Sequence, residues 1–100
     1  YIATLPIGYA DGLRRALSPG LKVRIGSEFF PIVGRICMDQ CMVDLGAHPW
    51  VQRWDEVCIF GPAPQDNSAQ TLADIAGTIP YEITCGIHKR VPRVFINEKR

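Results

Sequence analysis

The chain has 100 residues, which is the length of one domain, and 47% of them are hydrophobic, enough to fill a modest core. Eleven basic and ten acidic residues leave a formal net charge of +1, which gives no electrostatic attraction to nucleic acid or to a membrane surface. No apolar run is long enough to span a bilayer. We therefore expect neither nucleic acid nor a membrane as a partner, and a cytoplasmic location. Because the sequence opens without Met inside an apolar run, we interpret it as a domain of a longer protein.

Residues 2–7 are rich in branched side chains and predict a first strand. The next stretch, residues 8–20, holds several glycines and a proline, which indicates a long connection with one helical turn at 12–16. Long ordered connections in compact domains are often functional. This connection is therefore the first place to look for a site.

A β-hairpin is predicted next. Residues 21–25 alternate apolar and polar side chains with a period of two, as a half-buried strand does. Gly26 followed by Ser27 suits a type II′ turn, because glycine can occupy its first central position. The return strand is predicted to run over residues 28–38, and Pro31 within it indicates an edge position or a bulge.

Shorter elements fill the second half of the chain. Residues 41–45 and 56–60 predict strands, separated by a loop over residues 46–53. Residues 62–70 form a polar turn region. Residues 91–96 predict the last strand, followed by a solvated tail at 98–100.

One clear helix and one helical turn are predicted before that last strand. Thr71 is a suitable N-cap, Asp74 then stands at the third helical position, and Gly77 can end the helix. A second turn is predicted over residues 80–85, with Gly86 as its cap. The apolar face of the first helix consists of Leu72, Ile75 and Ala76.

Six or so short strands with one or two short helices favour a mainly β fold. We expect a closed or partly closed, Greek-key-like β-barrel. All 100 residues are assigned to it as one domain.

The cysteines and histidines give no metal-binding pattern. Paired C-x-x-C spacing is absent, so buried, reduced thiols are expected. Cys37 and Cys41, at i and i+4 of the predicted strand, are expected on one face. Neither histidine has a partner at metal or triad spacing, so no metal site is predicted. The residues concerned are Cys37, Cys41, Cys58, Cys85, His48 and His88.

Two segments each join an apolar run to a polar turn: Leu-Pro-Ile-Gly-Tyr-Ala-Asp-Gly at 5–12 and Val-Gly-Arg-Ile-Cys-Met-Asp-Gln at 33–40. A strand can hold the apolar part rigid and present Tyr9, or Met38 and Asp39, at its tip. Taken alone, the residue types of Tyr9, Met38 and Asp39 favour structural roles over functional ones. A turn tyrosine usually covers the core, and a methionine usually fills it. Asp39 would order its turn as a hydrogen-bond acceptor.

Together the two segments resemble the C-terminal domain of alanine racemase, and the resemblance continues through Arg-Val-Pro-Arg at 90–93, near the end of the chain. It implies a mostly β domain that packs beside a (β/α)₈ barrel, in a homodimer that interconverts L- and D-alanine for peptidoglycan precursors. The implied cofactor is pyridoxal phosphate, bound mainly by that barrel. The implied Schiff-base lysine and tyrosine base both lie upstream. No catalytic residue is therefore predicted in this chain, and the chain alone is expected to be inactive.

The resemblance also assigns expected roles at the site. Met38 matches a methionine whose backbone N–H binds the substrate carboxylate, and Asp39 supports it. Tyr9 matches a tyrosine near the substrate entrance of the partner subunit's site. Further matches to the entrance are Arg15, Arg35 and Ile87, whereas Arg14 is expected to be a surface arginine.

Lys89 departs from the family pattern. Some racemases of this family have a tyrosine there that contacts the cofactor phosphate. A lysine ammonium can serve a phosphate as a point charge. Its basic, polar surroundings exclude a Schiff-base role, which needs a buried and desolvated lysine.

Two other functions stay open. The whole protein could racemise another amino acid, such as serine, because the wall that would read the side chain lies mostly outside this chain. A β-barrel binding module without enzymatic activity is the alternative from a different class. The relative turnover of alanine and serine distinguishes an alanine racemase from a racemase of another amino acid. The absence of any turnover would favour the binding module.

Overall fold

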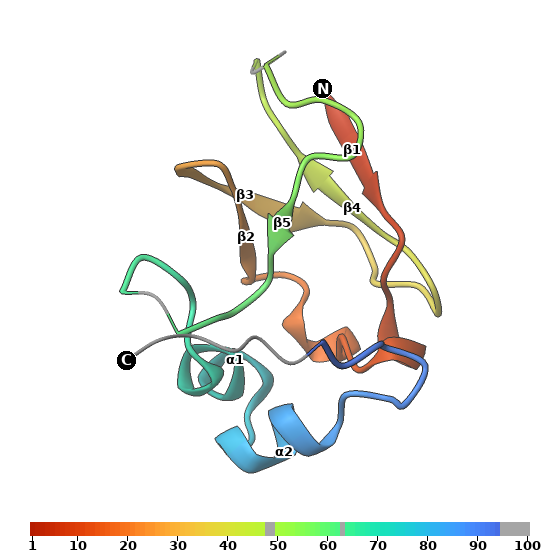
Figure 1. The fold of residues 1–100 in the computed structure, drawn as a ribbon, viewed down its shortest axis with the longest axis vertical. Helices are drawn as coiled ribbons and strands as arrows, with labels where there is room; N and C mark the ends of the chain where they lie inside the picture. Colours follow the sequence, from red (N-terminus) through yellow and green to blue (C-terminus); the bar gives the residue numbers. More distant parts are fainter. Residues whose placement is uncertain (48–49, 63, 95–100) are drawn as a thin grey trace.

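The computed structural model describes residues 1–47, 50–62 and 64–94. Its main feature is a curled antiparallel sheet of five strands in the order β1-β4-β3-β2-β5, with two short helices below it in Figure 1. The strands are β1 (Ile2–Leu5), β2 (Lys22–Ile25), β3 (Glu28–Val33), β4 (Cys41–Asp44) and β5 (Val57–Cys58). The helices are α1 (Ala69–Ala76) and α2 (Pro80–Cys85), and two 3₁₀ turns, η1 (Tyr9–Asp11) and η2 (Arg15–Leu17), follow β1.

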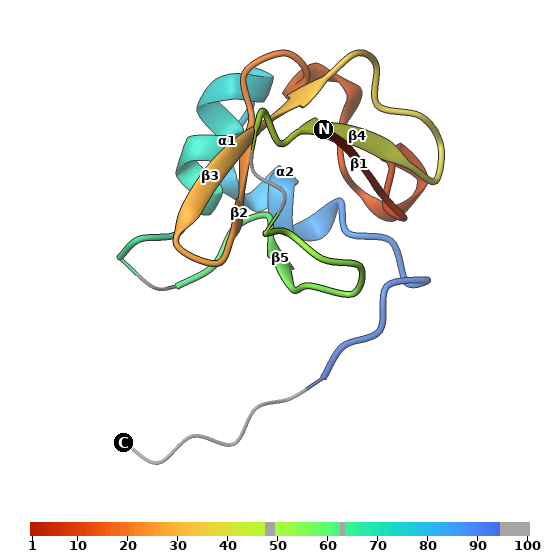
Figure 2. The same cartoon turned by 90° about the horizontal axis from the view of Figure 1, so that it is seen from above.

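The order of the strands is that of a Greek key. Strands β2, β3 and β4 are consecutive neighbours, and β1 returns to lie beside β4, with Ile2 opposite Asp44. Figure 2 shows the sheet curling from β1 and β4 through β3 and β2 to β5. This confirms the expected mainly β fold, in its partly closed form.

The inner face of the sheet and the helices share one core. On β2 and β4 the buried residues alternate with more exposed ones, as the pleat requires: Val23 and Ile25 on one strand, Cys41 and Val43 on the other. Helices α1 and α2 contribute three further buried residues, which are Leu72, Ala73 and Ile83. The connection after β1 adds Leu13 and Leu17, so the long loop is anchored from beneath and its outer residues are held in place.

The predicted hairpin is confirmed, but Pro31 lies neither at an edge nor at a bulge, because it pairs with Lys22 in the unbroken register between β2 and β3. Ile25 pairs with Glu28 across the turn, and Gly26 has a φ of +64°. Strand β3 lies in the middle of the sheet. Pro31 is tolerated because the ladder with β4 begins only at Ile32, so no hydrogen bond from position 31 is needed there.

The return strand is shorter than predicted. It ends at Val33, and Gly34, with a φ of +69°, turns the chain away. Residues 34–40 are therefore loop, so Cys37 and Cys41 do not share a strand face: Cys37 is exposed and Cys41 is buried. All four cysteines are free thiols, and two of them, Cys37 and Cys85, are exposed, contrary to the expected burial.

Helix α1 begins earlier than predicted. Its N-cap is Ser68, whose hydroxyl accepts a hydrogen bond from the N–H of Thr71 at 3.1 Å. Thr71 is thus inside the first turn, and Asp74 accepts a hydrogen bond from the Gln70 side chain at 2.8 Å. The predicted end at Gly77 is confirmed by its φ of +75°.

Helix α2 has the predicted bounds, and Gly86 caps it. Three other elements differ. The helical turn expected at 12–16 is replaced by η1 and η2, and the strand at 56–60 is reduced to β5. Residues 91–94 form no strand, because Arg93 turns back to bond carbonyls at 87, 88 and 91. Positions 95–96 of that predicted strand, the 98–100 tail and His48 lie outside the described residues.

Candidate functional site

The two tips predicted from the sequence lie against each other. The N–H of Tyr9 donates to the carbonyl of Cys37 at 2.9 Å, and the N–H of Ala10 donates to the carbonyl of Met38 at 2.9 Å. Gly8 makes this approach possible, since a Cβ at that position would lie 2.1 Å from the Cys37 carbonyl oxygen. The structure therefore holds Tyr9 and Met38 side by side through backbone contacts.

Both tip side chains are half exposed, 48% for Tyr9 and 53% for Met38, so Met38 is not core filler. The turn around Met38 is closed by a backbone hydrogen bond of 2.9 Å from the Cys37 N–H to the Gln40 carbonyl. Within the described part of the chain the Met38 N–H donates to no acceptor, and the Asp39 carboxylate accepts no hydrogen bond. The tip thus presents one fixed and unused backbone donor. The hydrogen bond by which Asp39 was expected to order its turn is thus not found among the described residues, and a supporting role of Asp39 at the site stays a prediction.

A third segment, residues 86–90, closes on the first tip. The N–H of His88 donates to the Asp11 carbonyl at 3.0 Å, and Nε of Arg90 lies 2.9 Å from Oδ1 of Asp11. Gly12 has a φ of +113°, and a Cβ there would lie 2.8 Å from the Cα of Ile87, so only glycine fits. In Figure 1 this blue segment passes beside the red turn that follows β1.

The predicted residues Ile87 and Lys89 are thereby brought to the side of the molecule that carries Tyr9. Ile87 is half-buried, whereas the ammonium of Lys89 is exposed. Within this domain Lys89 is therefore exposed and not the buried, desolvated lysine that a Schiff base needs.

The two predicted entrance arginines line a common hollow. Arg15 and Arg35 border a cavity of about 640 Å³ together with Ser18, Pro19 and Gly34. The hydroxyl of Ser18 donates to the Gly34 carbonyl and joins the two walls. Both arginines are exposed, and neither forms an ion pair among the residues with described positions. Two unpaired guanidinium groups make this hollow a local positive site that suits a small anion.

Arg14 differs from its neighbour Arg15. Its Nη2 donates to the Glu82 carbonyl at 3.3 Å and lies 3.8 Å from the Glu82 carboxylate. Arg14 is therefore not the plain surface arginine expected from the sequence. It ties the loop after β1 to α2.

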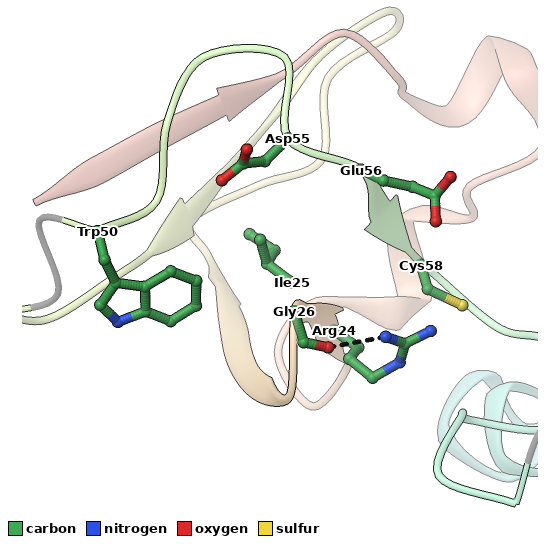
Figure 3. A pocket seen from close by; sticks show the side chains of 7 residues that line it. All are labelled: Arg24, Ile25, Gly26, Trp50, Asp55, Glu56 and Cys58. Carbon is green, nitrogen blue, oxygen red and sulfur yellow. Dashed lines mark hydrogen bonds between the residues drawn. The ribbon is translucent and has the colours of Figure 1, made fainter.

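A second hollow, of about 310 Å³, was not indicated by the sequence. Figure 3 shows Trp50, Asp55, Arg24 and Cys58 around it. The Arg24 guanidinium donates to Asp66 at 2.6 Å and to the Gly26 carbonyl at 2.7 Å, so its charge is already used. The hydrogen bond to Asp66 raises the pKa of Arg24, and burial raises the pKa of the Cys58 thiol. These shifts favour a fixed ion pair beside an unreactive thiol.

Other groups contribute little chemistry. Burial, with a smaller effect from Cys37, raises the pKa of Cys41 to about 11, which makes that thiol inert. Among the described residues, no three His, Cys, Asp or Glu side chains are grouped so that they could hold a metal ion. No helix in the described ranges is long and apolar enough to cross a membrane. No loop-to-helix phosphate cradle joins Lys89, because α2 ends before it.

Comparisons with known proteins agree with one another. The family model for "Alanine racemase, C-terminal domain" matches residues 1–95. The alanine racemase of Treponema denticola is 74% identical over 102 residues, which cover 98% of this chain and 27% of that protein. Alanine racemase 1 of Clostridium acetobutylicum is 54% identical, covering 95% and 25%.

Solved structures show the same relation. The alanine racemase of Clostridium difficile 630 superposes with a TM-score of 0.87 at 44% identity, covering 99% of this chain and 26% of that one. The enzyme from Streptomyces coelicolor A3(2) gives a TM-score of 0.90 at 41% identity, covering 97% and 25%. The chain therefore spans about a quarter of the length of the curated relatives that it matches.

Proposed function

Because the chain belongs to the alanine racemase C-terminal domain family, we propose that it is part of a pyridoxal-phosphate-dependent enzyme that interconverts L- and D-alanine. The observation that carries this proposal is the shared tip. Two loops far apart in sequence hold Tyr9 and the unused N–H of Met38 next to each other, and a third brings Lys89 to the same side. These are the positions that the resemblance assigned to substrate and cofactor.

In the proposed reaction, the Met38 N–H binds the substrate carboxylate. The neighbouring backbone groups are already bonded, Cys37 to Gln40 and the Met38 carbonyl to Ala10, so this donor is fixed before substrate arrives. A preorganised donor to a carboxylate forms a charge-assisted hydrogen bond without loss of ordering entropy. Arg15 and Arg35 attract the same carboxylate as it approaches.

The proton transfers are assigned to residues outside this chain. We propose that the Schiff-base lysine and the tyrosine base lie in the remaining three quarters of the protein, with the (β/α)₈ barrel. The role of residues 1–100 is then to bind and orient substrate, and the domain alone has no racemase activity.

A homodimer is proposed because the tip is exposed. Tyr9 and Met38 are 48% and 53% accessible, so a second subunit can reach them. In a twofold dimer each domain completes the site of the other subunit reciprocally.

The cofactor pyridoxal phosphate, when bound, supplies an electron sink for charge at the substrate Cα. The residue of this chain that suits its phosphate is Lys89, whose ammonium is exposed beside the fixed Arg90. Lys89 offers the phosphate one cation and no cradle of backbone N–H groups, which fits a supporting contact. We therefore assign most of the cofactor binding to the barrel. We also propose that the enzyme supplies D-alanine for peptidoglycan precursors. A cytoplasmic location is proposed because the free thiols favour a reducing compartment.

The test uses the full-length protein. Purified enzyme should carry the visible absorption of bound pyridoxal phosphate and convert L-alanine to D-alanine. Cofactor absorption together with faster turnover of serine than of alanine would show that the substrate is another amino acid. A protein with neither cofactor nor turnover would refute the racemase proposal and leave a β-barrel binding module.

A further inference from the structure

Asp11 joins the loop after β1 to the segment over residues 86–90. Its Oδ1 forms an ion pair with Nε of Arg90 over 2.9 Å, and its Oδ2 accepts a hydrogen bond from the Gly8 N–H at 2.9 Å. Its backbone carbonyl accepts from the His88 N–H at 3.0 Å. The Asp11 carboxylate is 12% exposed and the Arg90 side chain 45%, so the ion pair is shielded from water on the side of the carboxylate.

These contacts link Asp11 to the chain neighbours of Tyr9 and of Lys89. Gly8 precedes Tyr9, and the N–H of Tyr9 donates to the carbonyl of Cys37. Met38 is the residue that follows Cys37 in the chain. On the other side, His88 and Arg90 flank Lys89. Movement of Asp11 would therefore change the distance between the Tyr9–Met38 tip and Lys89.

The segment that Asp11 holds is rigid in itself. Nη1 of Arg93 donates to the carbonyls of His88 at 2.7 Å and Val91 at 2.6 Å, and Nη2 donates to that of Ile87 at 2.8 Å. Arg93 thus sets the shape of residues 87–91, while Asp11 sets where that shape lies. Within the described residues the Asp11–Arg90 ion pair is the one charged contact of this segment, and beside it only the His88 N–H bonds Asp11, so loss of the ion pair should loosen the segment as a unit.

We propose that Asp11 is a positioning residue, which through Arg90 and Gly8 sets the spacing between the Met38 donor and the Lys89 segment and so determines substrate affinity. The inference rests on the proposed racemase function. Asp11 touches neither substrate nor cofactor in this proposal. Its loss should weaken substrate binding more than it slows the chemical step.

Asp11→Asn is the informative substitution. The asparagine oxygen can still accept from the Gly8 N–H, but the neutral amide loses the charged contact to Arg90. In the full-length enzyme, KM for L-alanine should rise about tenfold and kcat should change less than about threefold. Arg90→Gln should raise KM to a similar extent. The double variant, with both Asp11→Asn and Arg90→Gln, should have a KM no higher than that of either single variant.

The matched control is Asp66→Asn, which removes a carboxylate from another arginine ion pair, to Arg24, away from the tip. It should lower stability without raising KM. Amide hydrogen exchange of residues 86–90 gives a readout independent of activity. Exchange there should quicken in Asp11→Asn and Arg90→Gln but not in Asp66→Asn.

The outcomes are distinct. Faster exchange with a raised KM supports the proposal, and unchanged exchange overturns it. Faster exchange with unchanged KM shows that Asp11 only holds structure, and also overturns it. If the wild-type enzyme does not convert alanine, the proposed function is refuted. The expected effect on KM is then refuted with it, whatever the result of the hydrogen exchange measurement.

Discussion

Gly8→Ala tests whether the contact between the two loops builds the site. An alanine Cβ would lie 2.1 Å from the Cys37 carbonyl oxygen and 2.5 Å from the Met38 carbonyl carbon. Ordinary contacts are above 3.4 Å, so the loops must separate by more than an ångström. The backbone at Gly8 has a φ of −151°, which alanine adopts freely, so the clash alone is tested.

Separation breaks the hydrogen bonds from Tyr9 and Ala10, each 2.9 Å long. Two lost bonds at about 1 kcal/mol each and overpacking of about 1–3 kcal/mol predict a loss of roughly 3–5 kcal/mol. Because Met38 moves with its loop, kcat/KM for L-alanine should fall by at least about tenfold. Urea unfolding and racemase kinetics of the full-length enzyme measure both effects.

The control is Gly34→Ala, at a position where a Cβ meets nothing within 4 Å but φ is +69°. It should cost only about 1 kcal/mol of backbone strain. The reasoning would be refuted if Gly8→Ala were no less stable than Gly34→Ala, or if it kept full kcat/KM.

Three further predictions concern single groups. Met38→Pro removes the backbone N–H and should lower kcat/KM about tenfold to a hundredfold, whereas Met38→Leu keeps the N–H and should stay near wild type; equal losses in steady-state assays would argue against backbone recognition. Ser68→Ala removes the observed N-cap of α1 and should cost about 1 kcal/mol in urea unfolding, while Thr71→Val should cost less; the reverse order would support the cap predicted from the sequence. The pKa of Cys41 is raised from 9.0 to about 11, so its neutral thiol stabilises the fold fully below pH 9 and this stability is lost as pH rises toward 11. The difference in unfolding free energy between wild type and Cys41→Ala should therefore narrow by up to about 2–3 kcal/mol from pH 8 to 11, and a constant difference would show that Cys41 titrates normally.

Local chemistry explains what could be predicted from the sequence. Gly26 followed by Ser27 specifies the hairpin because the turn needs a positive φ only at its first central position. Gly77 ends α1, and Pro80 begins α2, for equally local reasons. The segments at 5–12 and 33–40 also identified the tip residues through their resemblance to one family.

Other features depended on which segments meet. Pro31 indicated an edge position or a bulge, but β3 is central, and the proline is tolerated there because the β4 ladder starts one residue later. Thr71 was predicted as the N-cap of α1, but serine is as suitable at this position as threonine, and Ser68 is the cap. The start of α1 was decided by the Ser68 hydroxyl, which accepts the Thr71 N–H.

The site itself combines both kinds of information. Sequence alone determined that Tyr9 and Met38 stand in turns beside apolar segments, because glycines and strand ends act over a few residues. Only the tertiary structure decided that these turns meet, that Gly8 must lack a side chain, and that Asp11 and Arg90 form an ion pair. A contact between residues far apart in the chain depends on how the whole core packs, and no short pattern encodes it.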